Sequence, residues 1–133
     1  MPQTMEFSSS TSRRAASLLP RFDCTLTDGG LDAAWVRVTG ELDLATAPIL
    51  AQALSQAEER TQRVVLDMRE LTFMDSSGVH VILEASHRAT TAGRGLVLVR
   101  GPAQVDRVLD LTRAADSLEI VDLHPVEPPS SRF

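Results

Sequence analysis

One point of the chain combines an acid, two hydroxyls and a glycine: Asp75, Ser76, Ser77 and Gly78. A short connection separates this point from an apolar run at residues 64–68 that is typical of a strand. After it, over residues 79–92, apolar residues recur at the spacing of a helix. A strand-to-helix turn of this composition has three chemical uses. It can cap the helix, present a nucleophile, or take part in phosphate chemistry.

Capping is the simplest interpretation, because a Ser or Asp side chain here can accept hydrogen bonds from the first free N–H groups of the helix. Capping does not exclude phosphate chemistry. A phosphoserine would add about two negative charges at neutral pH. Since Asp75, Glu41 and Asp43 are already acidic, that phosphate would repel an acidic partner or block close contact with any partner. The composition favours a switchable contact surface over a phosphate-holding pocket.

The nucleophile interpretation is weaker, because a catalytic serine needs an oriented base and an oxyanion hole. The available bases are His80, His87 and His124. His80 lies one helical turn after Ser76, but no carboxylate is evident to orient it, and an exposed polar residue near a helix start explains it better. The histidines and Cys24 lack metal-ligand spacing, and no glycine-rich nucleotide loop is present. We therefore expect no catalytic residue, metal or cofactor.

The elements that must position these residues alternate between strands and helices. Strands are expected at residues 22–26, 34–39, 64–68, 96–99 and 118–123, and helices at 46–60, 79–92 and 101–112. This order predicts an α/β fold with a mixed, mostly parallel sheet of about five strands, helices packed against it, and an antiparallel hairpin at the N-terminal edge. The run at 64–68 is apolar enough to be covered on both faces.

Functional surfaces of such sheets tend to lie outside the carboxyl ends of the strands. Two polar connections leave carboxyl ends, at residues 40–46 and 75–78, and they lie side by side if the second and third strands are neighbours. Thr46 is predicted to be the N-cap of the first helix. On the second helix, Glu84 and Arg88 have the spacing of an i,i+4 ion pair.

Composition narrows the function classes. The net charge is −5 and all 13 basic residues are arginine, which argues against binding to nucleic acid or to an acidic membrane. A single cysteine, Cys24, cannot form an internal disulfide, and no apolar run approaches the ~20 residues of a membrane span. These features predict a cytoplasmic protein.

The length of 133 residues fits one domain. Residues 1–20, rich in Ser, Thr and Arg, have no sustained periodicity and are expected to form a flexible arm. The domain itself is expected over residues 21–124. Prolines at 125, 128 and 129 predict a disordered tail over residues 125–133.

Two stretches together resemble a known family. The first is residues 64–68 followed by 71–79, which contain Met74, Asp75, Ser76, Ser77 and Gly78; the second is residues 40–43 followed by 45–50. Over about residues 21–123 the chain resembles the STAS domains of bacterial anti-sigma factor antagonists. The element order also agrees, and the two motifs at this spacing are more specific than Asp-Ser-Ser-Gly alone.

The resemblance implies a partner-switching role in transcription. An unphosphorylated antagonist of this family binds an anti-sigma factor that is also a serine kinase, which frees a sigma factor to join RNA polymerase. The kinase uses ATP to phosphorylate a serine at the start of the second helix, and Ser76 matches it. Phosphorylation breaks the complex, and a metal-dependent serine phosphatase restores it. No nucleic acid and no membrane take part in these contacts.

The resemblance also implies which residues meet the partner. The expected set is Glu41, Asp43, Asp75, Ser76, Ser77, Gly78 and His80. His80 departs from the family pattern, where a small residue is common, so its ring could alter the fit to the kinase or mark a different partner. Many members also carry a helix after the last strand, and the proline-rich tail cannot form one.

Two alternatives remain open. The chain could be a STAS-type scaffold that binds without being phosphorylated, in a stress-signalling or lipid-transport complex. It could also be a serine hydrolase, which predicts that a fluorophosphonate labels Ser76.

Overall fold

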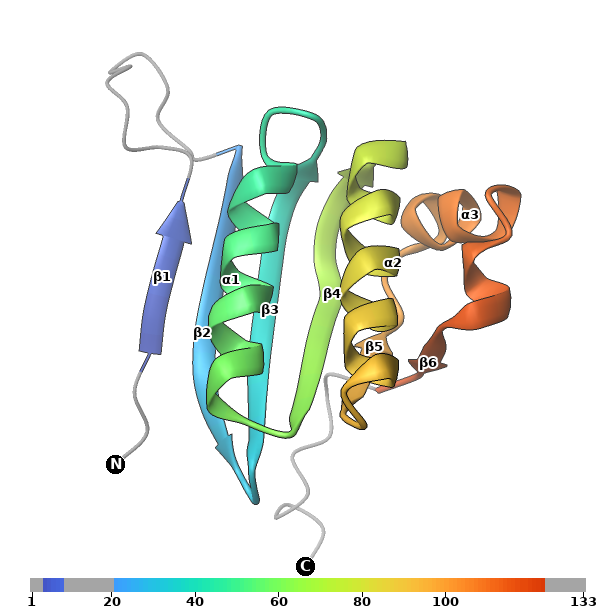
Figure 1. Cartoon of the computed structure of the whole chain (residues 1–133). Helices are drawn as coiled ribbons and strands as arrows, with labels where there is room; N and C mark the ends of the chain where they lie inside the picture. The colour runs from blue at the N-terminus through green and yellow to red at the C-terminus, as the bar shows by residue number, and fades with distance from the viewer. Residues whose placement is uncertain (1–3, 9–20, 124–133) are drawn as a thin grey trace, which may run out of the picture.

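The computed structural model describes residues 4–8 and 21–123, which form one six-stranded sheet and three α-helices (Figure 1). The strands are β1 (Thr4–Ser8), β2 (Phe22–Gly30), β3 (Ala33–Leu42), β4 (Arg63–Met74), β5 (Gly95–Val99) and β6 (Glu119–Val121). The helices are α1 (Ala47–Arg60), α2 (Ser76–Thr91) and α3 (Ala103–Leu111), followed by a 3-10 turn at Ala114–Ser117. The predicted α/β class with a mixed sheet is confirmed.

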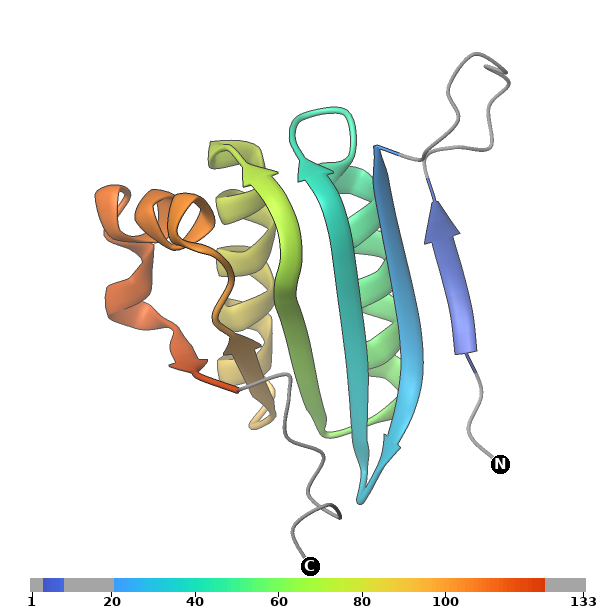
Figure 2. The same cartoon turned by 180° about the vertical axis from the view of Figure 1, so that it is seen from behind.

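The strands lie in the sheet in chain order, β1-β2-β3-β4-β5-β6. The first three pair antiparallel, and β3 to β6 pair parallel. Each parallel connection joins a strand to its neighbour, and successive connections advance across the sheet in one direction. Because such crossovers are right-handed, their helices all lie on one face of the sheet. Figure 1 shows α1 and α2 in front of the sheet. In the view from behind, no helix of the described chain covers the opposite face (Figure 2).

The one-sided packing corrects one prediction, namely that β4 is covered on both faces. Val64, Leu66 and Met68 alternate along β4 and are buried in the core under the helices. The residues between them belong to the open face, where Val65 is only half-buried. Asp67 is the buried exception on that face, because its carboxylate accepts two hydrogen bonds from the Arg69 guanidinium, at 3.0 and 2.9 Å.

Strand β1 corrects a second prediction, since it lies inside the segment expected to be a flexible arm. It pairs with β2 along its whole length, from Thr4↔Thr27 to Ser8↔Asp23. Met5 and Phe7 are half-buried against the core. The sheet therefore has six strands, and β1 rather than the β2–β3 hairpin forms its edge. Residues 9–20 of the expected arm, and the expected tail at 125–133, lie outside the described residues.

Strand β4 is longer than predicted, and its extension matters for the site. The expected connection after residue 68 is part of the strand, which continues in parallel pairing with β3 as far as Leu42↔Met74. Leu71 and Met74 are buried within this extension. A single residue, Asp75, separates the end of β4 from the start of α2.

The ion pair predicted within α2 is wrong. Arg88 instead reaches α1, where its Nε and Nη2 donate to the two carboxylate oxygens of Glu58 at 3.0 and 2.8 Å. Glu84 contacts His80 one turn earlier, with 3.2 Å between Oε2 and Nε2. The bidentate Arg88–Glu58 pair ties the two helices together on the covered face of the sheet.

Cys24 is buried in β2. Burial raises the pKa of its thiol to about 12, and the nearby Asp23 carboxylate contributes in the same direction. The thiol is therefore protonated and unreactive at neutral pH.

Candidate functional site

The start of α2 is capped by Asp75. This residue has extended backbone, and its Oδ1 accepts a hydrogen bond from the Ser77 N–H at 2.8 Å. Its carbonyl accepts from the Gly78 N–H at 3.1 Å. The Ser76 side chain, by contrast, is exposed and makes no hydrogen bond to any group in residues 4–8 or 21–123. A capping role for Ser76 is thus not observed: the acid caps the helix, and the first hydroxyl is left free.

Gly78 lets the first turn of α2 sit directly on the strand ends. A Cβ built at this position would lie 2.6 Å from Leu42 Cδ2 and 2.9 Å from Met74 Cγ. Both distances are shorter than any real Cβ contact. The glycine is required by this close approach to β3 and β4, and its role is to position Ser76 and Ser77.

The two polar connections lie side by side, as predicted. The Asp75 N–H donates to the Leu42 carbonyl at 3.1 Å, which joins the start of α2 to the end of β3. The loop between β3 and α1 begins at that carbonyl. The parallel pairing of β3 with β4 therefore delivers Glu41, Asp43 and Ser76 to the same end of the sheet.

Asp43 and Thr46 hold the β3–α1 loop together from within. The Asp43 Oδ1 accepts from the N–H groups of Ala45 and Thr46, at 3.0 and 3.1 Å. Thr46 is buried, and its hydroxyl accepts from the Asp43 N–H and donates to the Glu41 carbonyl, both at 2.9 Å. Thr46 is the N-cap of α1, as predicted, but its side chain organises the loop and caps no helical N–H.

Arg21 pairs with both acids of this loop. Its Nη2 lies 2.8 Å from Asp43 Oδ2, and its Nε lies 3.6 Å from Glu41 Oε1. The Arg21 carbonyl also accepts the Glu41 N–H at 2.7 Å. Arg21, Glu41 and Asp43 together carry a net charge of −1, whereas the two acids alone would carry −2. The loop is therefore less negatively charged than its two acids alone would make it. The β2–β3 pairing, Phe22↔Gly40, explains why Arg21 reaches Glu41.

An open groove of about 530 Å³ runs between the starts of α1 and α2. Its walls are Leu44, Ala47, Pro48, Ser76, Ser77, His80 and Val81. Leu44 is 77% exposed at the tip of the β3–α1 loop. His80 also lines a second groove farther along α2, with Leu83, Glu84, His87 and Arg88. We call the first of these the switch groove.

Three of the predicted residues, Ser76, Ser77 and His80, share the switch groove. Asp75 and Gly78 act below it, by capping and by close packing. Sequence reasoning missed Leu44, although a lone apolar residue in a polar loop was a usable signal. It also missed Arg21, which the hairpin register could have placed opposite Glu41.

The serine hydrolase alternative gains one feature and lacks another. Glu84 contacts His80, which supplies a carboxylate that was not evident from the sequence. However, the described chain contains no hydrogen bond between Ser76 and His80, although a nucleophilic serine needs such a base.

Within the described ranges, no group of three His, Cys, Asp or Glu side chains could hold a metal ion. No helix of that part is long and apolar enough to cross a membrane.

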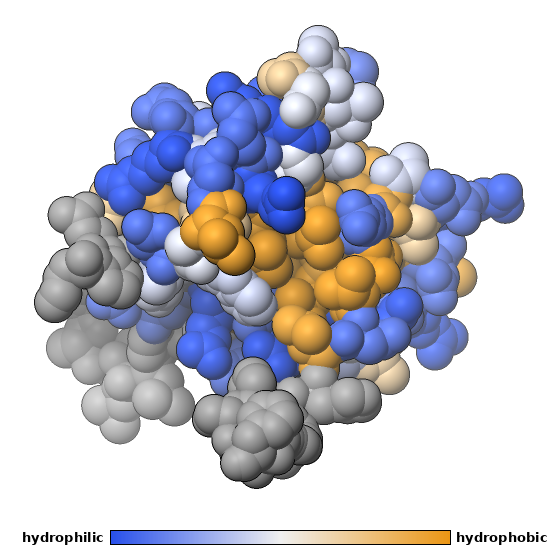
Figure 3. All heavy atoms as spheres, turned by 90° about the horizontal axis from the view of Figure 1, so that it is seen from below, coloured by the Kyte–Doolittle hydropathy of each residue, from blue (hydrophilic) through white to orange (hydrophobic). Residues whose placement is uncertain are grey.

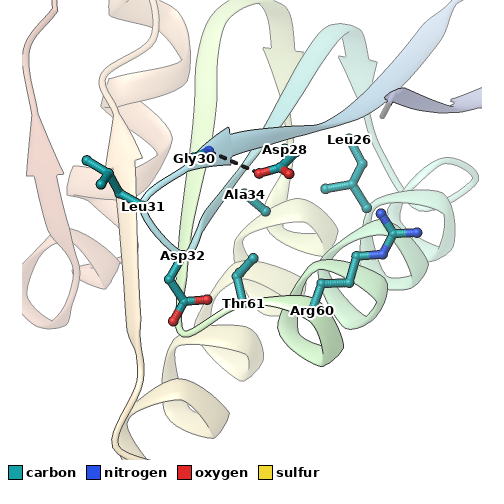
Figure 4. A pocket seen from close by; sticks show the side chains of 8 residues that line it. All are labelled: Leu26, Asp28, Gly30, Leu31, Asp32, Ala34, Arg60 and Thr61. Atoms are coloured by element: carbon teal, nitrogen blue, oxygen red, sulfur yellow. Dashed lines mark hydrogen bonds between the residues drawn. The ribbon is translucent and has the colours of Figure 1, made fainter. Parts of the chain in front are cut away.

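A third pocket lies at the opposite end of the sheet, between the β2–β3 turn and the end of α1 (Figure 4). Asp28 and Asp32 lie on its turn side, and Arg60 lies on its helix side. Leu31, on the same turn, is 98% exposed, and apolar side chains gather on this end of the molecule (Figure 3). This end carries none of the residues expected to meet a partner.

Comparison with known proteins settles the family. The model of the STAS domain family matches residues 27–127, most of the chain. The chain belongs to the STAS domain family. An anti-sigma F factor antagonist from Paenibacillus polymyxa is 33% identical over 89 residues, which cover 65% of this chain and 76% of the relative.

Two solved structures share the STAS fold of this chain. An anti-sigma factor antagonist from Mycobacterium paratuberculosis matches with a TM-score of 0.68 at 22% identity, over 74% of this chain and 84% of its own. The Bacillus cell fate determinant SpoIIAA in its phosphorylated form matches with a TM-score of 0.62 at 19% identity, over 83% and 99%. At such identities, these likenesses establish the fold alone.

Proposed function

We propose that this STAS domain protein is an anti-sigma factor antagonist, a binding protein rather than an enzyme. In its unphosphorylated form it binds an anti-sigma factor with serine kinase activity, and so frees a sigma factor. Relatives named as antagonists of anti-sigma F and anti-sigma B factors support this proposal. We place the protein in the cytoplasm, where ATP and sigma factors occur.

The proposed switch is the hydroxyl of Ser76, and one observation carries it. Because Asp75 caps α2, the exposed Ser76 Oγ is free of hydrogen bonds within the described chain. The kinase can transfer the γ-phosphoryl group of ATP to this oxygen without breaking a contact that holds the fold. An Oγ–P bond forms as the bond between the β- and γ-phosphates breaks, ADP leaves, and the hydroxyl proton is released.

Phosphate at this position would block the switch groove. One wall of the groove is apolar, made by Leu44, Ala47 and Pro48, and a partner that packs there must remove water from it. A phosphoserine adds about two negative charges at its rim, and a charge without a partner is costly to bury. Since Arg21 offsets the neighbouring acids, the phosphate would dominate the local charge. A metal-dependent serine phosphatase would then restore binding.

The predicted partner-binding residues divide into two roles in this proposal. Ser76, Ser77 and His80 meet the partner directly from the groove. Glu41, whose side chain is half-exposed beside Arg21, meets it from outside the groove. Asp43, like Asp75 and Gly78, acts by positioning, because its Oδ1 accepts N–H groups of the loop and its Oδ2 pairs with Arg21.

The test uses Ser76→Ala, with Ser77→Ala as the matched control one residue away. The Ser76→Ala chain, which cannot be released by phosphorylation, captures its partner from extracts of the native cells, and mass spectrometry identifies that partner. The purified partner is then incubated with ATP and each variant. We expect phosphate on the wild type and on Ser77→Ala, and none on Ser76→Ala. Phosphorylation of Ser76→Ala at the wild-type rate would refute the site, and a chain never phosphorylated in cells would favour the scaffold alternative.

A further inference from the structure

Ser76, His80 and Glu84 lie at positions i, i+4 and i+8 of α2, so they follow one another along one face of the helix. His80 stands in the middle. In the unphosphorylated chain its Nε2 contacts Glu84 Oε2 at 3.2 Å, and its side chain is 72% exposed. It also lines the switch groove together with Ser76. The imidazole thus has one acidic neighbour on one side and a hydroxyl that can be phosphorylated on the other.

The other charged groups nearby are already engaged. Arg21 pairs with Glu41 and Asp43, across the β3–α1 loop. The Asp75 carboxylate caps the helix, and Arg88 is tied to Glu58 on α1. His87 lines the second groove and not the switch groove. The α1 wall of the switch groove is uncharged, so His80 is the one lining residue of that groove able to carry a positive charge.

We propose that phosphate on Ser76 draws His80 away from Glu84 and forms an ion pair with its imidazolium across one turn of α2. This inference rests on the proposed phosphorylation of Ser76. A phosphate carries more charge than a carboxylate and offers three acceptor oxygens. An acid placed N-terminal to a base at i,i+4 is the favourable orientation on a helix. Side chains on a helix also lean toward its N-terminus, which turns His80 toward Ser76.

The ion pair changes how release of the partner works. A phosphate held by His80 lies over the switch groove and occupies the space that the partner needs, in addition to adding charge. Only the protonated imidazole carries the positive charge that this pair needs.

The test uses the full chain with phosphoserine incorporated at position 76 during translation, so no kinase is needed. A ³¹P NMR titration follows the second ionisation of the phosphate in three chains: the parent, His80→Gln, and His87→Gln as the control on the same helix. We expect the midpoint to lie about 0.3 pH unit lower in the parent than in His80→Gln, as an i,i+4 ion pair on a helix predicts. The control should match the parent.

Equal midpoints in the parent and His80→Gln would overturn the inference. So would equal shifts in both glutamine variants, since a general charge effect would then explain them. In the parent, the imidazole NMR signals of His80 should move on phosphorylation while those of His87 stay in place. Unchanged His80 signals would also refute the contact. The outcome is independent of whether cells phosphorylate Ser76, so failure here and failure of the proposed function can be told apart.

Discussion

The replacement of Gly78 by alanine tests how the switch groove is built. The added Cβ would lie 2.6 Å from Leu42 Cδ2, 2.7 Å from Leu42 Cγ and 2.9 Å from Met74 Cγ. All three atoms belong to buried side chains at the ends of β3 and β4. Overpacking of this kind costs roughly 1–3 kcal/mol, while alanine regains up to about 1 kcal/mol of helix propensity. We expect a net loss of about 1–2 kcal/mol in the free energy of unfolding.

The assay is urea unfolding followed by circular dichroism, with Gly95→Ala as the control. At Gly95 an added Cβ would be 3.5 Å from Arg63 Cγ, an ordinary contact, so we expect no loss of stability there. In the background of Leu42→Ala, which makes room for the new methyl group, Gly78→Ala should cost about 1 kcal/mol less than in the wild type. A Gly78→Ala chain as stable as the wild type, or equal costs in the two backgrounds, would refute the packing argument.

Three further predictions test the cap, the groove and the open face of the sheet. Asp75→Ala should lower the unfolding free energy by roughly 0.5–2 kcal/mol, because the Ser77 N–H loses its acceptor; unchanged urea midpoints would show that the cap is unimportant. Leu44→Ser should change stability by less than about 0.5 kcal/mol, yet weaken partner binding by roughly 1–2 kcal/mol in calorimetry; equal affinity would exclude Leu44 as an anchor. Burial of Asp67 opposes its ionisation, but hydrogen bonds from Arg69 outweigh the effect of burial and lower the pKa of the carboxyl group. The ionised carboxylate therefore stabilises the fold above about pH 4, and this stabilisation is lost as the pH falls further. In Asp67→Asn, the free energy of unfolding should therefore fall less steeply below about pH 4 than in the wild type. Identical profiles of unfolding free energy against pH in the two chains would contradict this.

The fold class was predictable because strands and helices alternate in strong local patterns. Phe22, Cys24 and Leu26 alternate cleanly in β2, and all three are buried. Strand β1 was not predictable, since five residues with Met5 and Phe7 as their apolar pair carry too little periodicity. The extent of β4 was hidden by Glu70 and the other polar residues beyond position 68.

The site was predictable in outline, because parallel strands bring their carboxyl ends together. Sequence pattern placed Ser76 at the helix start but could not decide between Asp75 and a serine as the cap. Ion pairs were the least predictable feature. Arg88 selects Glu58 on another helix over Glu84 on its own, because a bidentate contact across α1 and α2 is better than a single exposed i,i+4 pair.

The central claim is that phosphate on Ser76 turns a partner-binding groove into a surface that the partner cannot use. Calorimetric titration of the anti-sigma factor kinase with the unphosphorylated chain, and with the chain that carries phosphoserine at 76, tests it most directly. We predict that the phosphorylated chain binds at least tenfold more weakly, a loss of roughly 1.4 kcal/mol or more. Equal affinities for the two chains would contradict the claim.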